Sequence, residues 1–289
     1  MSRRYPCRKL TETFGIEAID VDLNGVNLEE DHEWLEQLRD DLRRHRAVLF
    51  RRQRLSGSRQ VEISSCLGRV QSTFYKHPRS PHPDIFRVSN DKTEGCTNVG
   101  RSGWHLDGTF QSRPFQYQTM YFESVVPGGN TLFMPLHEFF EAQSKETQER
   151  WDHLWMMTER REAPIHPLVC QHPHRKDTTM LFHCGRPFCQ GWLVDAGDQV
   201  TKTTLPAAVV QDELTESLND LMPSMGLTMQ WEEGDFIIND NLALAHFASD
   251  GTQADPTEHG LRILHRTTIV GGPETIPRKA DGRCSFRAL

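Results

Sequence analysis

Hydrophobic residues recur at helical spacing near the N-terminus and gather in short runs along the rest of the chain. Residues 28 to 45 place apolar side chains three or four positions apart among charged ones, which predicts an amphipathic helix. Its apolar positions are Trp34, Leu35, Leu38 and Leu42. The continuous apolar run 47–50 predicts a buried strand, and residues 56–67 predict a second helix.

Further along the chain, residues 71–104 are rich in proline and glycine, which predicts loops that frame the entrance to a site. An apolar face predicts a helix at about 136–151. Strands are expected at about 117–125, 130–134, 227–231, 235–239, 243–247 and 261–269. Helices outside short strands suit an α+β domain, but periodicity alone does not distinguish an open sheet from a closed one.

Composition limits the classes of function. The 289 residues, 36% of them apolar and 25% charged, are typical of a soluble globular protein of one large domain or two small ones. A net charge of -7 without a basic stripe argues against nucleic acid or an anionic membrane as a partner and favours small molecules. The N-terminus has charges but lacks the apolar core of a signal peptide, and the seven cysteines lack paired spacing. These features predict a cytoplasmic protein with reduced thiols and no membrane span.

The segment Trp104-His105-Leu106-Asp107 carries the first candidate chemistry. On a strand, side chains alternate between faces, so His105 and Asp107 would point the same way. If the distant His246 adds a third ligand, two histidines and one carboxylate hold one face of a metal and leave the other open, as in non-heme Fe(II) oxygenases. The alternative for His105 and Asp107 is a solvated pair at a strand end. The alternative for His246 is a buried histidine that is hydrogen-bonded to the backbone.

A pair of arginines, Arg262 and Arg266, lies in an apolar stretch that predicts a strand. Residues four apart on a strand face the same side, so both guanidinium groups would point the same way. An inward arginine requires an anion, whereas exposed arginines would be ordinary surface charges.

Taken in order, four short motifs resemble the taurine and 2,4-dichlorophenoxyacetate dioxygenase family of Fe(II)/2-oxoglutarate enzymes. They are W-H-x-D at 104–107, G-G-N-T at 128–131, D-N-x-x-x-x-H at 240–246 and R-x-x-x-R at 262–266. The resemblance spans roughly residues 15 to 271. It implies one domain over residues 1–289 with a mainly β fold and flanking helices, the double-stranded β-helix or cupin-like jelly roll.

The resemblance also implies a role for each matching residue. His105, Asp107 and His246 would bind Fe(II). The guanidinium of Arg262, with a hydroxyl hydrogen bond from Thr131, would hold the distal carboxylate of 2-oxoglutarate. The residues expected to contact a small anionic substrate are Arg266, His77 on a covering loop, and Arg101. The neighbours of His246 in its motif, Asp240 and Asn241, are expected to turn or brace the strand.

The implied activity is oxidation of an unactivated C–H bond by O2 with 2-oxoglutarate, giving succinate and CO2. Hydroxylation is the usual outcome, and desaturation or ring closure at the same site are alternatives. A non-catalytic metal-binding scaffold is the alternative outside enzymes, and a homo-oligomer is compatible with the sequence. Halogenation would need an open position where Asp107 stands.

A second group of potential ligands is Cys170, His172, His174, His183 and Cys184. Cysteines and histidines close in sequence can bind zinc, but this group lacks the C-x-x-C spacing of structural zinc sites. The sequence therefore favours the site at His105 over a zinc site here.

Overall fold

The computed structural model describes residues 4–71, 76–159, 161–185, 188–195 and 200–287. Its largest sheet runs in the order β1-β2-β3-β15-β6-β17-β4, with β5 pairing β17. These eight strands are β1 (Cys7–Lys9), β2 (Ile16–Ala18), β3 (Ala47–Phe50), β4 (Arg69–Val70), β5 (Phe86–Ser89), β6 (Tyr117–Ser124), β15 (Phe236–Asp240) and β17 (Ile263–Val270).

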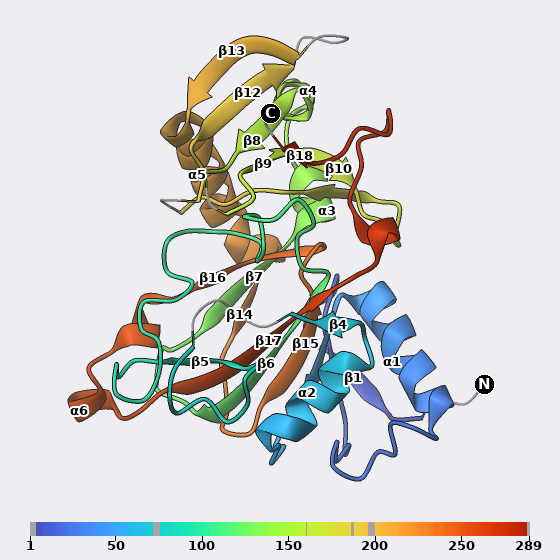
Figure 1. Ribbon diagram of the computed structural model, residues 1–289, viewed down its shortest axis with the longest axis vertical. Helices are drawn as coiled ribbons and strands as arrows, with labels where there is room; N and C mark the ends of the chain where they lie inside the picture. Colours follow the sequence, from blue (N-terminus) through green and yellow to red (C-terminus); the bar gives the residue numbers. More distant parts are fainter. Residues whose placement is uncertain (1–3, 72–75, 160, 186–187, 196–199, 288–289) are drawn as a thin grey trace.

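A smaller sheet of three antiparallel strands, in the order β14-β7-β16, lies beside it (Figure 1). Its strands are β7 (Thr131–Pro135), β14 (Leu227–Met229) and β16 (Leu244–Ala248). At the other end of the molecule, a sheet is formed by β8 (Leu154–Met157), β9 (Pro164–Pro167), β12 (Gly191–Asp195), β13 (Val200–Pro206) and β18 (Phe286–Arg287). The strands β10 (Val169–Gln171) and β11 (Thr178–Met180) pair with each other.

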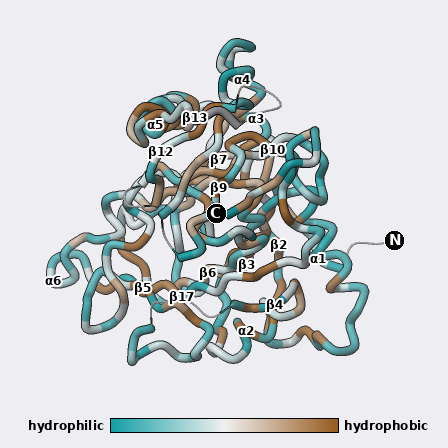
Figure 2. Tube along the Cα trace, turned by 45° about the horizontal axis from the view of Figure 1, so that its top comes forward, coloured by the Kyte–Doolittle hydropathy of each residue, from teal (hydrophilic) through white to brown (hydrophobic). Residues whose placement is uncertain are grey.

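The helices are α1 (His32–His45), α2 (Gly57–Ser65), α3 (Leu136–Glu141), α4 (Lys145–Asp152), α5 (Ala207–Met225) and α6 (Pro256–His259). Figure 1 shows α1 and α2 against the large sheet and α5 beside β12 and β13. Figure 2 shows hydrophobic stretches on strands such as β5 and β17 and hydrophilic ones on outer segments such as α4.

The large sheet is apolar on both faces, which explains the unbroken run at β3. Val48 of β3 packs with Trp34 of α1, on the face that the helices cover. Leu49, which points the opposite way, packs with Phe133 of β7 in a second core between the large and small sheets. The next strand, β15, alternates in the same way. The space between the two sheets is therefore a packed interior into which the side chains of both project.

The two N-terminal helices are confirmed, with slightly later starts. Asp31 caps α1 because its carboxylate accepts a hydrogen bond from the backbone N–H of Trp34 at 3.0 Å, so the helix begins at residue 32 rather than 28. Ser56 caps α2 in the same way through the N–H of Arg59.

Other expectations were wrong in detail. The helix expected over 136–151 is two helices, because α3 ends at Glu141 and Ser144 caps a new one by accepting from the N–H of Thr147 at 3.1 Å. The stretch expected to be irregular contains β5, which pairs with β17. Helix α5 and strands β8 to β13 were not predicted.

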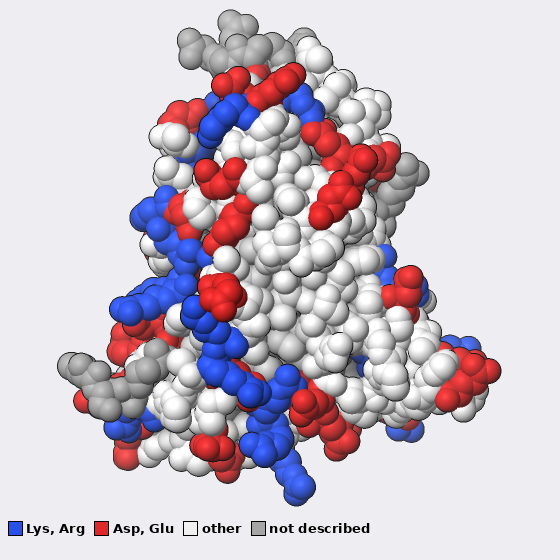
Figure 3. All heavy atoms as spheres, turned by 180° about the vertical axis from the view of Figure 1, so that it is seen from behind, with Lys and Arg blue, Asp and Glu red and all other residues white. Residues whose placement is uncertain are grey.

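The expected combination of β-sheets with flanking helices is confirmed, and the single domain over residues 1–289 stays a prediction. No described helix is both long and apolar enough to cross a membrane. Figure 3 shows basic side chains in a band on the face opposite to that of Figure 1, with acidic ones among and beside them. Surface ion pairs such as Arg44 with Asp40 at 3.0 Å and Arg39 with Glu36 at 2.6 Å are in keeping with this mixing.

Packing under α1 predicts a measurable stability difference between two valines. Val48 is fully buried and Val209 of α5 is 49% exposed. Val48→Ala should lower the free energy of unfolding by about 1.5 to 3 kcal/mol, since it removes two buried methyl groups and leaves a cavity. Val209→Ala should change it by less than about 0.5 kcal/mol. Urea unfolding followed by circular dichroism measures both, and equal losses would contradict the assignment of the core.

Candidate functional site

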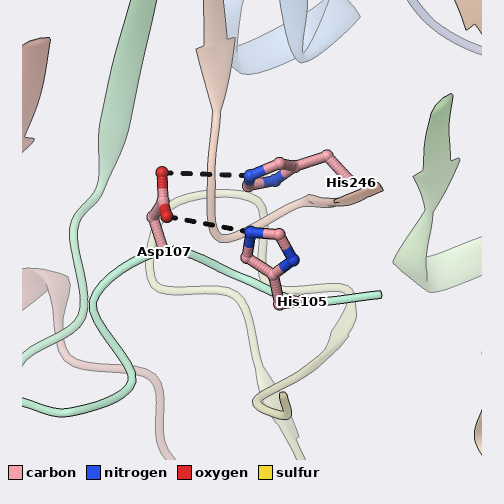
Figure 4. Close-up of side chains that lie close together, drawn as sticks. All are labelled: His105, Asp107 and His246. Carbon is pink, nitrogen blue, oxygen red and sulfur yellow. Dashed lines mark ion pairs between the residues drawn. The ribbon is translucent and has the colours of Figure 1, made fainter. Parts of the chain in front are cut away.

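His105, Asp107 and His246 converge between the two sheets. One ligand-type atom from each lies within 4.8 Å of the others, and this is the only such group of three or more among the residues that the structure describes. The Nε2 atoms of His105 and His246 lie 3.9 and 3.8 Å from the Asp107 carboxylate oxygens. Figure 4 shows both imidazoles directed at that carboxylate. The three side chains are thus poised to share one cation.

Backbone pairing brings the two histidines together. The N–H of His105 donates to the carbonyl of His246 at 3.1 Å, and the N–H of His246 donates to the carbonyl of His105 at 3.0 Å. Directly opposed residues project side chains to the same face, so the rings lie 4.3 Å apart, centroid to centroid. On its other edge, β16 pairs with β7, where His246 stands opposite Phe133. The segment at His105 therefore extends the small sheet beyond β16.

The ligand atoms are in the form that a metal requires. The Nδ1–H of His105 donates to the carbonyl of Gly103 at 2.7 Å, which leaves Nε2 unprotonated toward Asp107. Burial lowers the pKa of His105 and brings that of His246 to about 3. Burial alone would raise the pKa of Asp107, but Arg266 and the two histidines lower it below its usual value. Neutral imidazoles and an ionised carboxylate therefore coexist near neutral pH.

Asn241 holds the Asp107 loop in place. Asp107 lies in a turn just after the bridge at His105, so the strand alternation from which we inferred its direction does not orient it. Instead, the buried amide of Asn241 accepts from the N–H of Asp107 at 2.9 Å and donates to its carbonyl at 2.9 Å and to that of Phe115 at 2.7 Å. The bracing expected of Asn241 thus acts on the loop that carries the metal ligand. Its neighbour Asp240 contacts buried His172, with Nε2 to Oδ2 at 3.0 Å.

Arg266 contacts Asp107 directly. Its Nη1 donates to Oδ2 of Asp107 at 2.7 Å, and its guanidinium lies over the ring of Phe86, 5.0 Å from the centroid. The inward arginine expected from the sequence therefore has an anion in the protein itself. Its Nε is buried and has no hydrogen-bond partner among the described residues.

Arg262 has a different environment. It is 3% exposed, and no acidic side chain among the described residues pairs with it. Burial lowers its pKa to about 10, and its guanidinium lies 5.3 Å from the centroid of the Phe122 ring. A Cβ at Gly129 would come within 3.2 Å of its Cδ, so the second glycine of G-G-N-T leaves room for this side chain. A buried cation in this state needs an anionic ligand.

Thr131 lies close to the same group of aromatic residues. Its Oγ1 accepts a hydrogen bond from the indole N–H of Trp231 at 3.1 Å. The Trp231 ring stacks on that of Phe122 with centroids 4.0 Å apart, and Phe122 also lies under Arg262. Because the hydroxyl of Thr131 accepts from Trp231, its own proton is available for an acceptor.

A cavity of about 530 Å³ opens onto the metal-ligand group. Its wall includes His105, Asp107 and Arg266 but neither Arg262 nor Thr131. The remaining wall is mixed, with aromatic and aliphatic side chains between polar ones. Among its apolar members are Phe86, Val99, Leu106, Phe110 and Phe188. The cavity therefore offers an apolar chamber beside a cation and a candidate metal site, which suits a small molecule with a polar end.

Two of the predicted substrate contacts lie outside this wall. His77 is partly exposed, and its Nε2 lies 3.2 Å from the carbonyl of Lys92. Arg101 forms an ion pair with Asp250 at 2.9 Å, although its neighbours Gly100 and Ser102 do line the cavity. The roles suggested for His77 and Arg101 stay predictions.

The alternative zinc group does not assemble in the described part of the chain. His172 lies beside Asp240 instead, and His183 stacks on His105 with ring centroids 4.7 Å apart. His183 is a wall residue of the cavity that sequence reasoning did not place at the site. Its proximity to His105 depends on pairing between distant segments, for which no local signal exists.

Comparisons with known proteins agree with this geometry. The sequence profile described as "Taurine catabolism dioxygenase TauD, TfdA family" matches residues 7–268. An alpha-ketoglutarate-dependent sulfate ester dioxygenase of Pseudomonas putida is 24% identical over 92% of this chain and 90% of its own. An (S)-phenoxypropionate/alpha-ketoglutarate dioxygenase of Delftia acidovorans is 23% identical over 80% of this chain and 84% of its own. The crystal structure of a putative alpha-ketoglutarate-dependent taurine dioxygenase from Burkholderia xenovorans, 24% identical, superposes with a TM-score of 0.77 over 99% of this chain and 98% of that one.

The Asn241 amide predicts an effect on metal binding without direct ligation. Asn241→Ala removes three hydrogen bonds that hold the loop around Asp107, so we expect divalent-metal affinity to fall about 10- to 100-fold. Titration with Mn(II) followed by electron paramagnetic resonance measures the change, and Asn24→Ala, at an exposed asparagine, is the control. Unchanged Mn(II) affinity in a folded Asn241→Ala protein would show that the loop holds its shape without the amide.

Proposed function

The chain belongs to the taurine catabolism dioxygenase family (TauD, TfdA), and from this premise we propose that it oxidises a C–H bond of a small anionic molecule with Fe(II), 2-oxoglutarate and O2. The protein is an α-ketoglutarate-dependent dioxygenase, α-ketoglutarate being 2-oxoglutarate. Membership of this enzyme family argues against the non-catalytic scaffold. The observation that carries the proposal is the convergence of His105, Asp107 and His246 on one point. It is supported by the buried Arg262, which pairs with no acidic side chain among the described residues.

The donor set fits Fe(II). Two imidazole nitrogens and one carboxylate on one side of a cation leave the remaining positions for a chelating co-substrate and O2. The bound iron would supply the oxidation chemistry, coupled to the conversion of 2-oxoglutarate to succinate and CO2. The chain's own part is to fix the ligand atoms, through the pairing of His105 with His246 and the amide of Asn241 on the Asp107 loop.

Arg262 and Thr131 are proposed to hold the distal carboxylate of 2-oxoglutarate. A guanidinium that is 3% exposed and lacks an acidic partner among the described residues is suited to a carboxylate that arrives with the ligand. Thr131 has an unused hydroxyl proton close to the same aromatic group. In this assignment, the co-substrate would extend from the candidate metal ligands toward Arg262 and Thr131.

The proposed substrate is a small anion that binds in the 530 Å³ cavity with its charged group toward Arg266. Arg266 lines that cavity and is the residue through which a cation borders both the cavity and Asp107. Two relatives are named for a sulfate ester and for phenoxypropionate, both of which are anions at neutral pH. The apolar side chains of the wall would pack against the carbon skeleton.

We also propose that the two sheets at the site form the double-stranded β-helix that the motifs imply. The core between the large sheet and the strands β14, β7 and β16 supports this assignment, as does the position of the candidate metal ligands between the same sheets.

The first experiment tests the metal ligands one by one. His105→Ala, Asp107→Ala and His246→Ala should each abolish Fe(II)-dependent conversion of 2-oxoglutarate to succinate, because two donors do not retain the ion. Circular dichroism should stay close to that of wild type, and His259→Ala, at an exposed histidine of α6, is the matched control. Normal succinate formation by any of the three variants removes that residue from the ligand set.

The second experiment separates the two arginines. Arg262→Gln should weaken 2-oxoglutarate binding by about 1.5 to 3 kcal/mol, the range for a hydrogen bond to a charged group, as measured by anaerobic titration of the Fe(II) charge-transfer band. Arg266→Gln should instead raise the KM of an anionic substrate and leave 2-oxoglutarate affinity nearly intact. The substrate panel contains alkyl sulfates, sulfonates, aryloxy carboxylates and amino acids, each with a neutral isostere. Loss of 2-oxoglutarate binding in Arg266→Gln would exchange the two roles, and equal turnover of neutral isosteres would refute the anionic substrate.

A further inference from the structure

His183 occupies the same row of side chains as the two candidate metal-binding histidines. It forms a β-bridge with His105, flanked by hydrogen bonds from the N–H of Cys184 to the carbonyl of Trp104 at 2.8 Å and from Leu106 to Phe182 at 3.3 Å. Opposed residues of paired strands project to the same face, so His183 points to the same side of the sheet as His105. It is one segment further from His246, at the edge that borders the cavity.

The ring of His183 is held on both sides. It stacks on His105 with centroids 4.7 Å apart and an interplanar angle of 19°, and on Phe188 at 4.1 Å and 21°. The side chain as a whole is 6% exposed. Its plane is therefore fixed, and only its edge is free to meet a ligand.

One hydrogen bond fixes which nitrogen of His183 carries the proton. The backbone N–H of Gly185 donates to Nδ1 at 2.9 Å, and a backbone N–H is always the donor, so Nδ1 is unprotonated. A neutral imidazole keeps one proton, which must then be on Nε2. Among the described residues, Nε2 has no hydrogen-bond partner, and it is not one of the fully buried polar atoms without a partner. The free donor is thus open to the cavity.

The donor faces the substrate side rather than the co-substrate side. The cavity wall contains His183, Phe188 and Arg266, whereas Arg262 and Thr131 are not part of it. We propose that His183 is a specificity-determining residue whose Nε2–H donates a hydrogen bond to an acceptor atom of the substrate. This assignment rests on the proposed function. Besides a negative charge for Arg266, the substrate would need a neutral hydrogen-bond acceptor for His183. A substrate without the acceptor would leave the Nε2–H unsatisfied next to the metal ligands.

The test uses a substitution that keeps the stack and removes only the donor. His183→Phe retains a ring between His105 and Phe188 but has no N–H, His183→Gln restores a donor, and His259→Phe at an exposed histidine is the control. The probes are hexyl sulfate, taurine and 2-phenoxypropionate, titrated anaerobically into the Fe(II)–2-oxoglutarate protein while the charge-transfer band is recorded. Fe(II) and 2-oxoglutarate affinities are measured separately. Nitrogen-15 NMR of histidine-labelled Zn(II) protein reads the His183 tautomer.

We expect His183→Phe to bind the probe that perturbs the wild-type band at least about tenfold more weakly, with partial recovery in His183→Gln. Fe(II) and 2-oxoglutarate affinities should stay close to those of wild type. Unchanged probe affinity overturns the proposal, as does a parallel loss of iron and 2-oxoglutarate binding, which would make the ring only structural. If none of the probes perturbs the wild-type band, the proposal of an anionic substrate is refuted. The position of the proton on the His183 ring then tests the role of His183 separately. A proton on Nδ1 overturns its role, and a proton on Nε2 supports it.

Discussion

The reciprocal backbone pairing of His105 with His246 is the contact on which the geometry of the site depends. Its two hydrogen bonds, of 3.1 and 3.0 Å, join segments far apart in the chain and make the imidazoles cross-strand neighbours. Because β16 is also paired with β7, the same register places Thr131 and Phe133 on the adjoining strand. A shift of one residue in β16 would turn His246 to the opposite face and separate it from Asp107. The order and register of the strands thus fix the geometry of the candidate metal site in the protein alone.

Charge divides the site into two halves. Arg266 has a partner in the protein, because its Nη1 contacts Asp107 at 2.7 Å. One ion pair therefore joins a candidate metal ligand to a residue of the cavity wall. Arg262 has no acidic partner among the described residues, although it is buried. An unpaired buried guanidinium opposes folding, so an anion that binds it stabilises the folded protein by mass action. Binding of a dicarboxylate at Arg262 would supply the negative charge that this buried guanidinium lacks among the described residues.

Much of the site could be predicted because its motifs are local, whereas the supporting contacts are not. His105, Asp107 and His246 do come together, but strand alternation was the wrong reason for Asp107, which lies in a turn held by Asn241. The bridge between His183 and His105 has no signature in either segment.

The differences between the predicted and the observed helices and strands have other causes. The cap at Ser144 that divides α3 from α4 was readable from its sequence, as was the four-residue spacing of buried side chains along α5. Both features therefore have local signals in the sequence. Strands β8 to β13 are different, because most are short and acquire their pairing only from the surrounding sheet.

The row of rings across the small sheet connects these observations. His183, His105, His246 and Phe133 stand opposite one another on four neighbouring segments, and only the two in the middle direct nitrogen atoms at Asp107. At one end, Phe133 belongs to the apolar core that also contains the aromatic residues around Arg262. At the other, His183 lines the cavity with Arg266. The row therefore lies between the proposed co-substrate side and the proposed substrate side. Under that proposal, a substitution at the His183 end would alter which molecule is accepted while the histidine pair that would bind the metal keeps its register.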